Sequence, residues 1–433
     1  MSADATAAAP PMGALRRIRS LLGGSAGNLV EWYDWYAYAA FGLYFSKIIF
    51  PPGSATKQLL DTALVFGLGF FARPLGAWLM GVYADRAGRK ASLTLSVALM
   101  CLGSLLIAVC PGFKDVGYAA PALLLGARLI QGISLGGEYG TSSTYLSEMA
   151  GRKHRGMWSS LQYMTLISGQ LIALGVLIVL QRTMAKPDLD AWGWRIPFVI
   201  GALLALSVFW LRRNIDETGS YRAVENRERG KTLWLVLRHP RESLTVLGLT
   251  AGGTLAFYCY TIYMQKFLAN TAGFSKDQAS EISALSLLIM MVVQPFYGWL
   301  SDKIGRRAML IGFGVMGVVG TWPILSTLSH THDWNTAFAL VVASVLIVSC
   351  YTSINAVVKA EMFPTEIRAL GVALPYAISN ALFGGTAEYV ALWCKDQGHE
   401  PWFYIYVTVV IGASLLVYLW MKDTRTHSRI VED

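Results

Sequence analysis

Long apolar runs separated by short polar segments dominate the chain. A helix needs about 20 apolar residues to cross roughly 30 Å of hydrocarbon. Only helices and closed barrels satisfy their backbone groups in lipid, and these runs are too long for barrel strands. The pattern therefore predicts an all-α membrane protein with twelve transmembrane helices. The predicted spans are residues 25–50, 58–83, 91–111, 118–147, 157–181, 194–212, 242–270, 278–301, 308–328, 336–359, 371–393 and 402–421.

One long polar segment, residues 213–240, separates the sixth predicted span from the seventh. We interpret it as a linker between two bundles of six helices. The predicted division is an N-terminal tail 1–20, a first bundle 21–213, a linker 214–240, a second bundle 241–421 and a C-terminal tail 422–433.

A motif recurs in the two halves. The loop after the second span reads GVYADRAGRK and the loop after the eighth reads GWLSDKIGRR, with Asp85 and Asp302 lying 217 residues apart. Glu148 and Glu361 lie 213 residues apart, and each is followed seven residues later by an arginine. Two pairs at nearly one offset indicate an internal duplication, with halves related by an axis along the membrane normal.

An acid at a helix end can pair with an arginine nearby or lie against a helix N-terminus. Glycine in such a loop permits tight turns and close helix approach. We therefore expect these loops to hold one end of the protein shut in one conformational state and to release it in the other. The expected gating residues are Gly81, Asp85, Arg86, Gly88, Arg89, Glu148, Arg155, Asp302, Gly305, Arg306, Glu361 and Arg368.

Composition excludes an ordinary soluble protein. Apolar residues make up 54% of the chain and charged residues 15%, against about 25% charged in soluble domains. The net charge of +9 sits in short loops, so nucleic acid is not expected as a partner. With both termini in the cytoplasm, the cytoplasmic segments hold 24 of the 36 Lys and Arg residues, as the positive-inside rule requires.

The termini and the cysteines add little further chemistry. Arg16, Arg17 and Arg19 precede a long apolar run without a clean cleavage site, so we expect a retained first helix. The five cysteines show no CxxC spacing, which predicts neither a disulfide framework nor a metal site. No cofactor is expected.

Ionisable residues at bilayer depth are costly and usually mark a transport pathway or a proton relay. Proton coupling needs a carboxylate whose pKa changes between states, which a nearby arginine or desolvation can cause. The candidates for this role are Asp34, Glu31 and Glu138, with Arg128 as the cationic partner. Two alternatives stay open: Asp34 and Arg128 can form a purely structural pair, and Glu31 can be a solvated charge in a cavity.

Fixed cations at bilayer depth can bind an anion, and arginine can hold a carboxylate through two parallel hydrogen bonds. Arg73 lies twelve residues before Asp85, near mid-membrane, although it can instead satisfy carbonyls freed by Pro74. Lys266 lies near a helix end, where snorkelling to the interface is equally open. We expect the favoured charges to lie in the first half and the second half to lack counterparts. The candidate substrate-binding residues are Arg73, Arg128, Tyr163, Gln170, Tyr258, Lys266 and Asn380.

The repeated loops resemble the signature loops of the major facilitator superfamily. The runs GNLVEWYDWY, FFARPLGAW, ARLIQGISLGGEYGTSSTYLSE and WGWRIPF resemble the metabolite:proton symporter family within it, and the resemblance covers residues 20–421. The later runs YTIYMQKFLANTAGF, YTSINAVVKAEMFPTEIRALGV and NALFGGTAEYVAL resemble the α-ketoglutarate permeases of that family. In related facilitators an RxxQG run in the fourth span often faces an acid of the first, which implies that Arg128 faces Asp34.

The resemblance implies proton-coupled uptake of a small organic anion, a dicarboxylate such as α-ketoglutarate, by a monomer in a bacterial inner membrane. Citrate, shikimate or a zwitterionic osmolyte are the alternative substrates. The osmolyte porters tend to carry a long C-terminal extension, whereas this chain ends about twelve residues after the last span.

Two other classes of function are less favoured. A membrane sensor that kept a transporter fold would carry a large soluble output domain, and the chain shows none. A membrane enzyme would carry a catalytic motif, and we find no HExxH, GxSxG or nucleotide-binding loop. We therefore expect no catalytic residues.

Overall fold

The computed structural model describes residues 14–87, 89–135, 152–213, 239–364 and 368–430, and every regular element in these ranges is helical. The elements of the first half follow in chain order. They are α1 (Ala14–Ile49), α2 (Ala55–Ala87), α3 (Arg89–Ala108), the short α4 (Phe113–Val116), α5 (Ala119–Leu135), the turn η1 (Arg152–His154), α7 (Arg155–Thr183), α8 (Lys186–Ala191), the turn η2 (Gly193–Arg195) and α9 (Ile196–Arg213).

Three spans of the second half are divided into shorter elements. The elements are α11 (Pro240–Phe257), the π-helical segment η5 (Tyr258–Tyr263), α12 (Met264–Asn270), α13 (Lys276–Ile304), α14 (Arg306–Leu328), α15 (Trp334–Thr352), α16 (Asn355–Met362), α17 (Arg368–Ser379), the π-helical segment η6 (Asn380–Gly385), α18 (Ala387–Asp396) and α19 (Pro401–Trp420).

The twelve predicted spans correspond to these helices, with boundaries that differ by a few residues, although the end of the fourth, residues 136–147, lies outside the described residues. The largest difference is at α1, which begins at Ala14 rather than near residue 25. Eight helices of the described part are long and apolar enough to cross a membrane by length and composition. The first and eleventh spans fall outside that set, and the third and fourth appear in the described residues as shorter apolar helices, Thr94–Ala108 and Ala119–Ser134.

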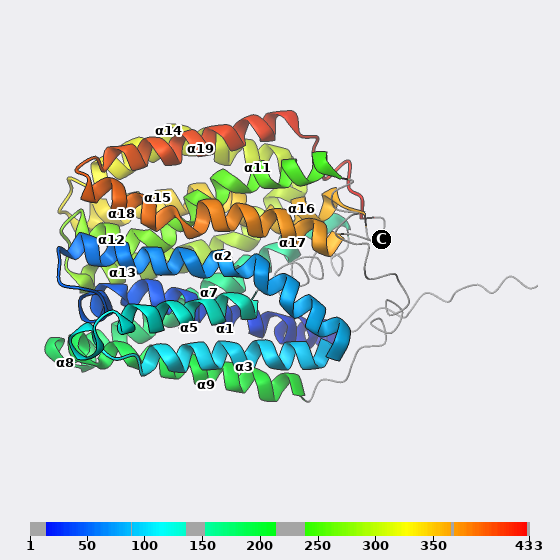
Figure 1. Ribbon diagram of the computed structural model, residues 1–433. Helices are drawn as coiled ribbons and strands as arrows, with labels where there is room; N and C mark the ends of the chain where they lie inside the picture. Colours follow the sequence, from blue (N-terminus) through cyan, green and yellow to red (C-terminus); the bar gives the residue numbers. More distant parts are fainter. Residues whose placement is uncertain (1–13, 88, 136–151, 214–238, 365–367, 431–433) are drawn as a thin grey trace, which may run out of the picture.

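The two halves pack side by side, with the first half along one flank and the second along the other (Figure 1). Helix α7 packs along α13, and α2 packs along α17, η6 and α18. These two seams, together with the contact of α1 with η5 and α12, join the halves. Linker residues 214–238 and the first residues of the N-terminal tail lie outside the described residues.

Glycines allow close approach within the first half, where α2 crosses α5. A Cβ atom on Gly132 would lie 2.2 Å from the backbone oxygen of Gly69, and one on Gly76 would lie 2.3 Å from the backbone oxygen of Ile133. Small residues at a membrane helix interface permit this backbone contact, which supplies packing energy that lipid cannot. The crossing therefore fixes where α5 presents its polar residues.

We expect Gly132→Ala to destabilise the protein by about 1–3 kcal/mol, the usual cost of overpacking, because backbone atoms cannot move aside as a flexible side chain can. Gly126→Ala on the same helix is the matched control, since its Cβ would meet nothing within 4 Å. Thermal unfolding of the detergent-purified variants would measure the difference. Equal melting temperatures for the two variants would contradict this account of the crossing.

Candidate functional site

A buried polar network joins three helices of the first half around Asp34. Its Oδ1 accepts a hydrogen bond from the Ser104 hydroxyl at 2.6 Å, and its Oδ2 accepts one from Gln131 Nε2 at 2.5 Å. Arg128 Nη1 lies 3.7 Å from Asp34 Oδ2 and donates to Gln131 Oε1 at 2.8 Å. Asp34 and Arg128 thus meet, as the RxxQG resemblance implied, and Gln131 bridges them.

Aromatic rings enclose the cation of this network. The Arg128 guanidinium lies 3.8 Å from the centre of the Trp35 ring and 4.3 Å from that of Tyr38. The Arg73 guanidinium lies 4.3 Å from the same Trp35 ring and 4.1 Å from Phe70. Cation–π contact of this kind stabilises a desolvated guanidinium. Trp35 therefore contacts both Arg128 and Arg73.

Glu31 and Arg73 form a second buried ion pair in the first half. Glu31 Oε1 lies 3.5 Å from Arg73 Nη2, and both side chains are largely buried. Glu31 is therefore a paired carboxylate rather than a fully solvated one. Within the described part of the chain, the Nε and Nη2 atoms of Arg73 are buried without a hydrogen-bond partner.

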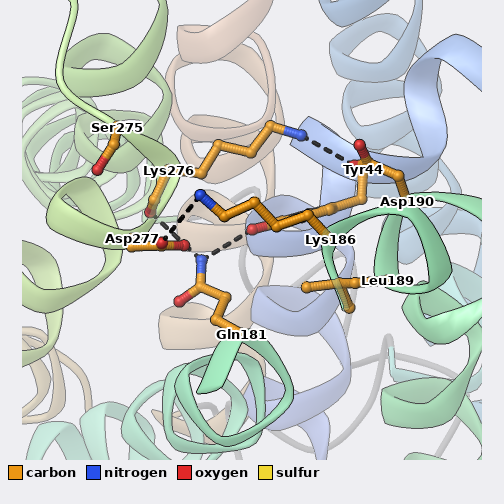
Figure 2. Close-up of a pocket in the computed structure, with 8 residues that line it drawn as sticks. All are labelled: Tyr44, Gln181, Lys186, Leu189, Asp190, Ser275, Lys276 and Asp277. Atoms are coloured by element: carbon orange, nitrogen blue, oxygen red, sulfur yellow. Dashed lines mark hydrogen bonds and ion pairs between the residues drawn. The ribbon is translucent and has the colours of Figure 1, made fainter. Parts of the chain in front are cut away.

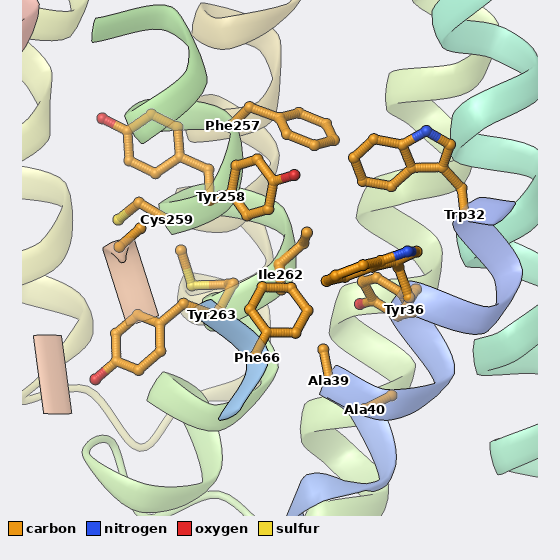
Figure 3. Close-up of a cluster of buried hydrophobic side chains, with 14 of the residues drawn as sticks. Trp32, Tyr36, Ala39, Ala40, Phe66, Phe257, Tyr258, Cys259, Ile262 and Tyr263 are labelled. Carbon is orange, nitrogen blue, oxygen red and sulfur yellow. The ribbon is translucent and has the colours of Figure 1, made fainter. Parts of the chain in front are cut away.

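An aromatic layer closes the centre of the protein between the halves (Figure 3). Tyr258 of η5 packs against Phe70 with ring centres 5.5 Å apart and against Trp32 at 6.3 Å. Phe257 packs edge-on against Trp32 at 6.0 Å and against Tyr163 of α7 at 5.5 Å. Residues far apart in sequence thus meet at the boundary between the halves.

The other polar candidates lie near this layer or on the helices that carry it. Asn380 of η6 and Tyr258 both lie against Gly384, where a Cβ atom would be 2.6 Å and 2.7 Å from them. Gln170 is fully buried on α7, and neither polar atom of its amide has a hydrogen-bond partner in the described part of the chain.

Lys266 differs most from its sequence-based interpretation. It does not extend to an interface; it is buried on α12 and forms an ion pair with Glu388 of α18. The expectation that the second half lacks buried charged pairs is therefore wrong. Sequence reasoning missed the pair because its members lie 122 residues apart, and no spacing rule connects them.

The end of the bundle that carries the loop of residues 302–306 is called the motif end here. Asp302 lies at the start of α7 in the opposite half, where its two carboxylate oxygens accept hydrogen bonds from the backbone N–H groups of Gly156 and Met157 at 2.9 and 3.0 Å. An acid at a helix N-terminus satisfies free N–H groups and complements the helix dipole. Asp302 therefore caps a helix of the other half.

Arginines surround this cap at the motif end. Arg306 lies 2.8 Å from Asp302 and 3.8 Å from Glu361, and Arg155 of the first half lies 3.6 Å from Glu361. Gly298 allows the approach, since its Cβ would lie 2.6 Å from the backbone oxygen of Gly156. The expected gating residues of the second half are thus brought together with Arg155.

Part of the C-terminal tail contributes contacts that the sequence did not predict. Thr424 donates to Glu361 at 2.6 Å, and Asp423 accepts from the backbone N–H of Arg306 at 3.2 Å. Arg368 donates to the backbone oxygens of Phe363 and Arg429, each at 3.2 Å. Gly305 has φ of +102°, and a Cβ there would lie 2.2 Å from Asp423 Oδ2.

Several expected site residues cannot be placed. Gly88, Glu138 and Glu148 lie outside the described residues. Gly81, Asp85 and Arg86 belong to the last turns of α2 and Arg89 begins α3, but the description does not extend to their side chains. Metal-ligand clusters are absent from the part of the chain that the structure describes.

The halves also meet at the opposite end, called the far end here and formed by residues 181–190 and 275–281 (Figure 2). Gln181 donates to the Tyr44 hydroxyl at 2.8 Å and to Ser280 of the second half at 3.1 Å. The ion pairs Arg182–Glu281 (3.1 Å) and Lys186–Asp277 (3.7 Å) cross between the halves. The pocket there, of about 150 Å³, is smaller than the roughly 300–1,000 Å³ of organic ligand sites.

Asp190, on the short helix α8 outside the spans, links the far end to α1 and α13. It lies 2.9 Å from Lys47 and 3.2 Å from Lys276. Partial burial raises the pKa of Asp190, but the hydrogen bond from Lys47 and the charge of Lys276 lower it more, so the pKa lies below its ordinary value. The carboxylate is therefore ionised throughout the neutral range.

Comparisons with known proteins place this geometry in context. The family described as "Sugar (and other) transporter" matches residues 22–236, and the one described as "Major Facilitator Superfamily" matches residues 246–432. The chain is 52% identical over 408 residues to the alpha-ketoglutarate permease of Escherichia coli K12, covering 94% of each protein. It is 32% identical to the citrate-proton symporter of Salmonella typhi, covering 98% of this chain and 97% of that one.

Solved structures show the same fold at lower identity. The crystal structure of the D-xylose-proton symporter superposes with a TM-score of 0.73 at 18% identity, covering 94% of this chain and 98% of that one. The xylose transporter of E. coli in a partially occluded inward open conformation gives a TM-score of 0.71, also at 18% identity, with 93% and 97% covered.

Asp302→Asn should weaken the motif end, because the neutral amide loses the ion pair with Arg306 and is a poorer acceptor for the start of α7. We expect the amides of Gly156 and Met157 to lose about 0.5–2 kcal/mol of protection, measured by hydrogen–deuterium exchange. Lys303→Gln, at the exposed neighbouring position, serves as the control. Unchanged protection in Asp302→Asn would show that the carboxylate is not the cap.

Asp190→Asn should change the rate of transport without changing the shape of its pH profile. Because the pKa of Asp190 is lowered in the folded protein, its carboxylate stabilises the far end fully above the unfolded pKa of about 3.9. This stabilisation is lost only when the pH falls through the still lower pKa of the folded protein. Any pH dependence of uptake between about pH 5 and 8 therefore arises from the titration of other groups. Measuring the uptake rate of wild type and Asp190→Asn across this pH range would test the prediction. A pH profile whose midpoint differs between the two proteins would contradict it.

Proposed function

Because this chain belongs to the major facilitator superfamily, we propose that it is a secondary active transporter that carries a dicarboxylate, α-ketoglutarate, into a bacterial cell together with protons. The relative named alpha-ketoglutarate permease, 52% identical over 94% of both chains, supports the substrate. The citrate-proton symporters among the relatives support the coupling ion. The two six-helix halves support a rocking mechanism around a central site.

We place the protein in the inner membrane with both termini and the motif end in the cytoplasm, since basic residues concentrate in the corresponding segments. The halves are assigned to residues 21–213 and 241–421, and a single chain is taken as the transporting unit. Each half contributes to both the central layer and the two closed ends.

The observation that carries the proposal is the Asp34 network. A fully buried carboxylate that faces one arginine and accepts two hydrogen bonds has its proton affinity set by that neighbour and by water access. When rocking changes either of these, Asp34 binds or releases a proton. Glu31 is assigned as an auxiliary acid through its pair with Arg73, and Glu138 stays a candidate from sequence alone.

Arg73 is the proposed anchor for the substrate. It lies beside the aromatic layer, and two of its nitrogens have no hydrogen-bond partner within the described part of the chain. A guanidinium of this kind can take a carboxylate through parallel hydrogen bonds. Tyr258 and Asn380, which meet at Gly384, and Tyr163 and Gln170 of α7 are the further polar candidates for the substrate, while Arg128 serves the Asp34 network.

Alternating access requires that the two ends open in turn. Asp302, Arg306 and Arg155 would close the cytoplasmic end. The hydrogen bonds of Gln181 and the ion pairs of Arg182 and Lys186 would close the outer end. In this structure the halves are in contact at both ends and at the aromatic layer between them.

Uptake of labelled α-ketoglutarate into proteoliposomes with an imposed pH gradient tests the substrate and the driving force together. We expect accumulation that collapses when a protonophore removes the gradient. Unlabelled citrate, shikimate and betaine serve as competitors for the alternative substrates. Strong uptake of one of these without accumulation of α-ketoglutarate would overturn the assignment.

Asp34→Asn should abolish accumulation driven by the pH gradient while preserving exchange of labelled for unlabelled α-ketoglutarate, because the amide keeps the fold of the network but carries no proton. Asp61→Asn, in a partly exposed position on α2, is the control and should accumulate normally. Both variants can be measured in the same vesicles as wild type. Full accumulation in Asp34→Asn would remove it as the coupling acid.

A further inference from the structure

The ion pair between Lys266 and Glu388 lies outside the network described above, in the second half of the chain. Both side chains are buried, at 1% and 3% exposure, and the Lys266 ammonium contacts Glu388 Oε1. Glu388 Oε2 is also buried, and it has no hydrogen-bond partner in the described part of the chain. A pair with only a structural role would be expected to have all of its polar atoms satisfied.

Each member of the pair follows an irregular stretch of backbone. Lys266 lies three residues after the end of the π-helical segment η5, which is Tyr263, and Glu388 lies three residues after the end of the π-helical segment η6, which is Gly385. Such wide turns are rare, and they occur frequently at functional sites because they change the direction of the following side chains. Two of them bring the acid and the lysine together.

The pair faces the other half of the protein. A Cβ atom on Gly42 of α1 would lie 3.1 Å from Lys266 Cε and 3.2 Å from its Nζ, and the same point lies 3.3 Å from Thr62 of α2. The ammonium is therefore at the boundary that opens when the halves rock. It lies between the aromatic layer of η5 and the far end, where α12 ends at Asn270.

Few charged groups act on Glu388. Lys266 is the cation that faces it, and the hydroxyls of Tyr38 on α1 and Tyr263 on η5 are the other titratable groups near enough to interact, as far as the described residues show. Protonation of Glu388 would therefore leave Lys266 as a buried cation without its acid. That arrangement is costly unless an anion takes the place of Glu388.

We propose that Lys266 and Glu388 form a proton-switched anion site: when Glu388 takes up a proton, the ion pair opens and the Lys266 ammonium binds one carboxylate of the substrate. The proton stays on Glu388 as a neutral carboxylic acid, and no covalent bond of the substrate changes. Release reverses the exchange. The inference rests on the proposed function and adds a second acid, in the second half, to the coupling of proton and anion.

Coupling of this kind is reciprocal, because the proton favours binding of the anion and the anion favours binding of the proton. The affinity for α-ketoglutarate should therefore rise as the pH falls, with Glu388 contributing about tenfold per pH unit while it is ionised in the free protein. Calorimetric titration of purified protein with α-ketoglutarate at several pH values would measure this slope.

Glu388→Gln imitates the protonated acid. We expect it to bind α-ketoglutarate at high pH at least as tightly as wild type and to reduce the slope of log Kd against pH by about one. Lys266→Met should weaken binding on the order of tenfold or more. Asp396→Asn, an exposed acid on the same helix, is the control and should keep the wild-type slope.

A merely structural pair predicts a different pattern. Both single variants would then weaken binding alike, and the double variant Lys266→Met/Glu388→Gln would recover it, since no unpaired charge remains. The proposal predicts that the double variant binds as weakly as Lys266→Met. A wild-type slope in Glu388→Gln, or recovery in the double variant, would overturn the proposal. If wild type itself binds no α-ketoglutarate, the proposed function fails and the inference with it.

Discussion

A charge inside a bilayer must be neutralised by a partner, and this constraint organises the protein. Isolated ionised groups at bilayer depth are expensive, so Asp34 and Arg128, Glu31 and Arg73, and Lys266 and Glu388 occur as pairs. Each pair joins two different helices. A change in the charge of one member would therefore change the favoured arrangement of helices, which is the link that we propose between proton binding and movement.

The two ends of the protein are closed by different physical means. At the motif end the charges are buried, and Asp302 satisfies backbone groups of a helix in the other half. At the far end the side chains of the crossing ion pairs are 34–82% exposed, and exposed pairs contribute about 0–1 kcal/mol each. We accordingly expect the far end to be the easier one to open, and we propose the aromatic layer at Tyr258 as the barrier common to both routes.

Hydropathy and the repeated loops predicted twelve helices in two halves, because span length and loop motifs are local properties of the sequence. The pairing of Asp34 with Arg128 was also accessible, through the RxxQG run. The pairing of Lys266 with Glu388 could not be predicted, because partners on separate helices leave no local signal in the sequence. A lysine near the end of a span also resembles one that extends to the membrane interface. The π-helical segments and the contacts of Thr424 with Glu361 were missed for the same reason.

The central claim is that entry of the organic anion is obligatorily linked to entry of protons through the buried acids. The most direct test records the external pH of lightly buffered proteoliposomes when α-ketoglutarate is added without any imposed gradient. The account predicts that the medium becomes alkaline as the anion enters, in proportion to the amount taken up. Uptake that leaves the external pH unchanged, or makes it acidic, would contradict it.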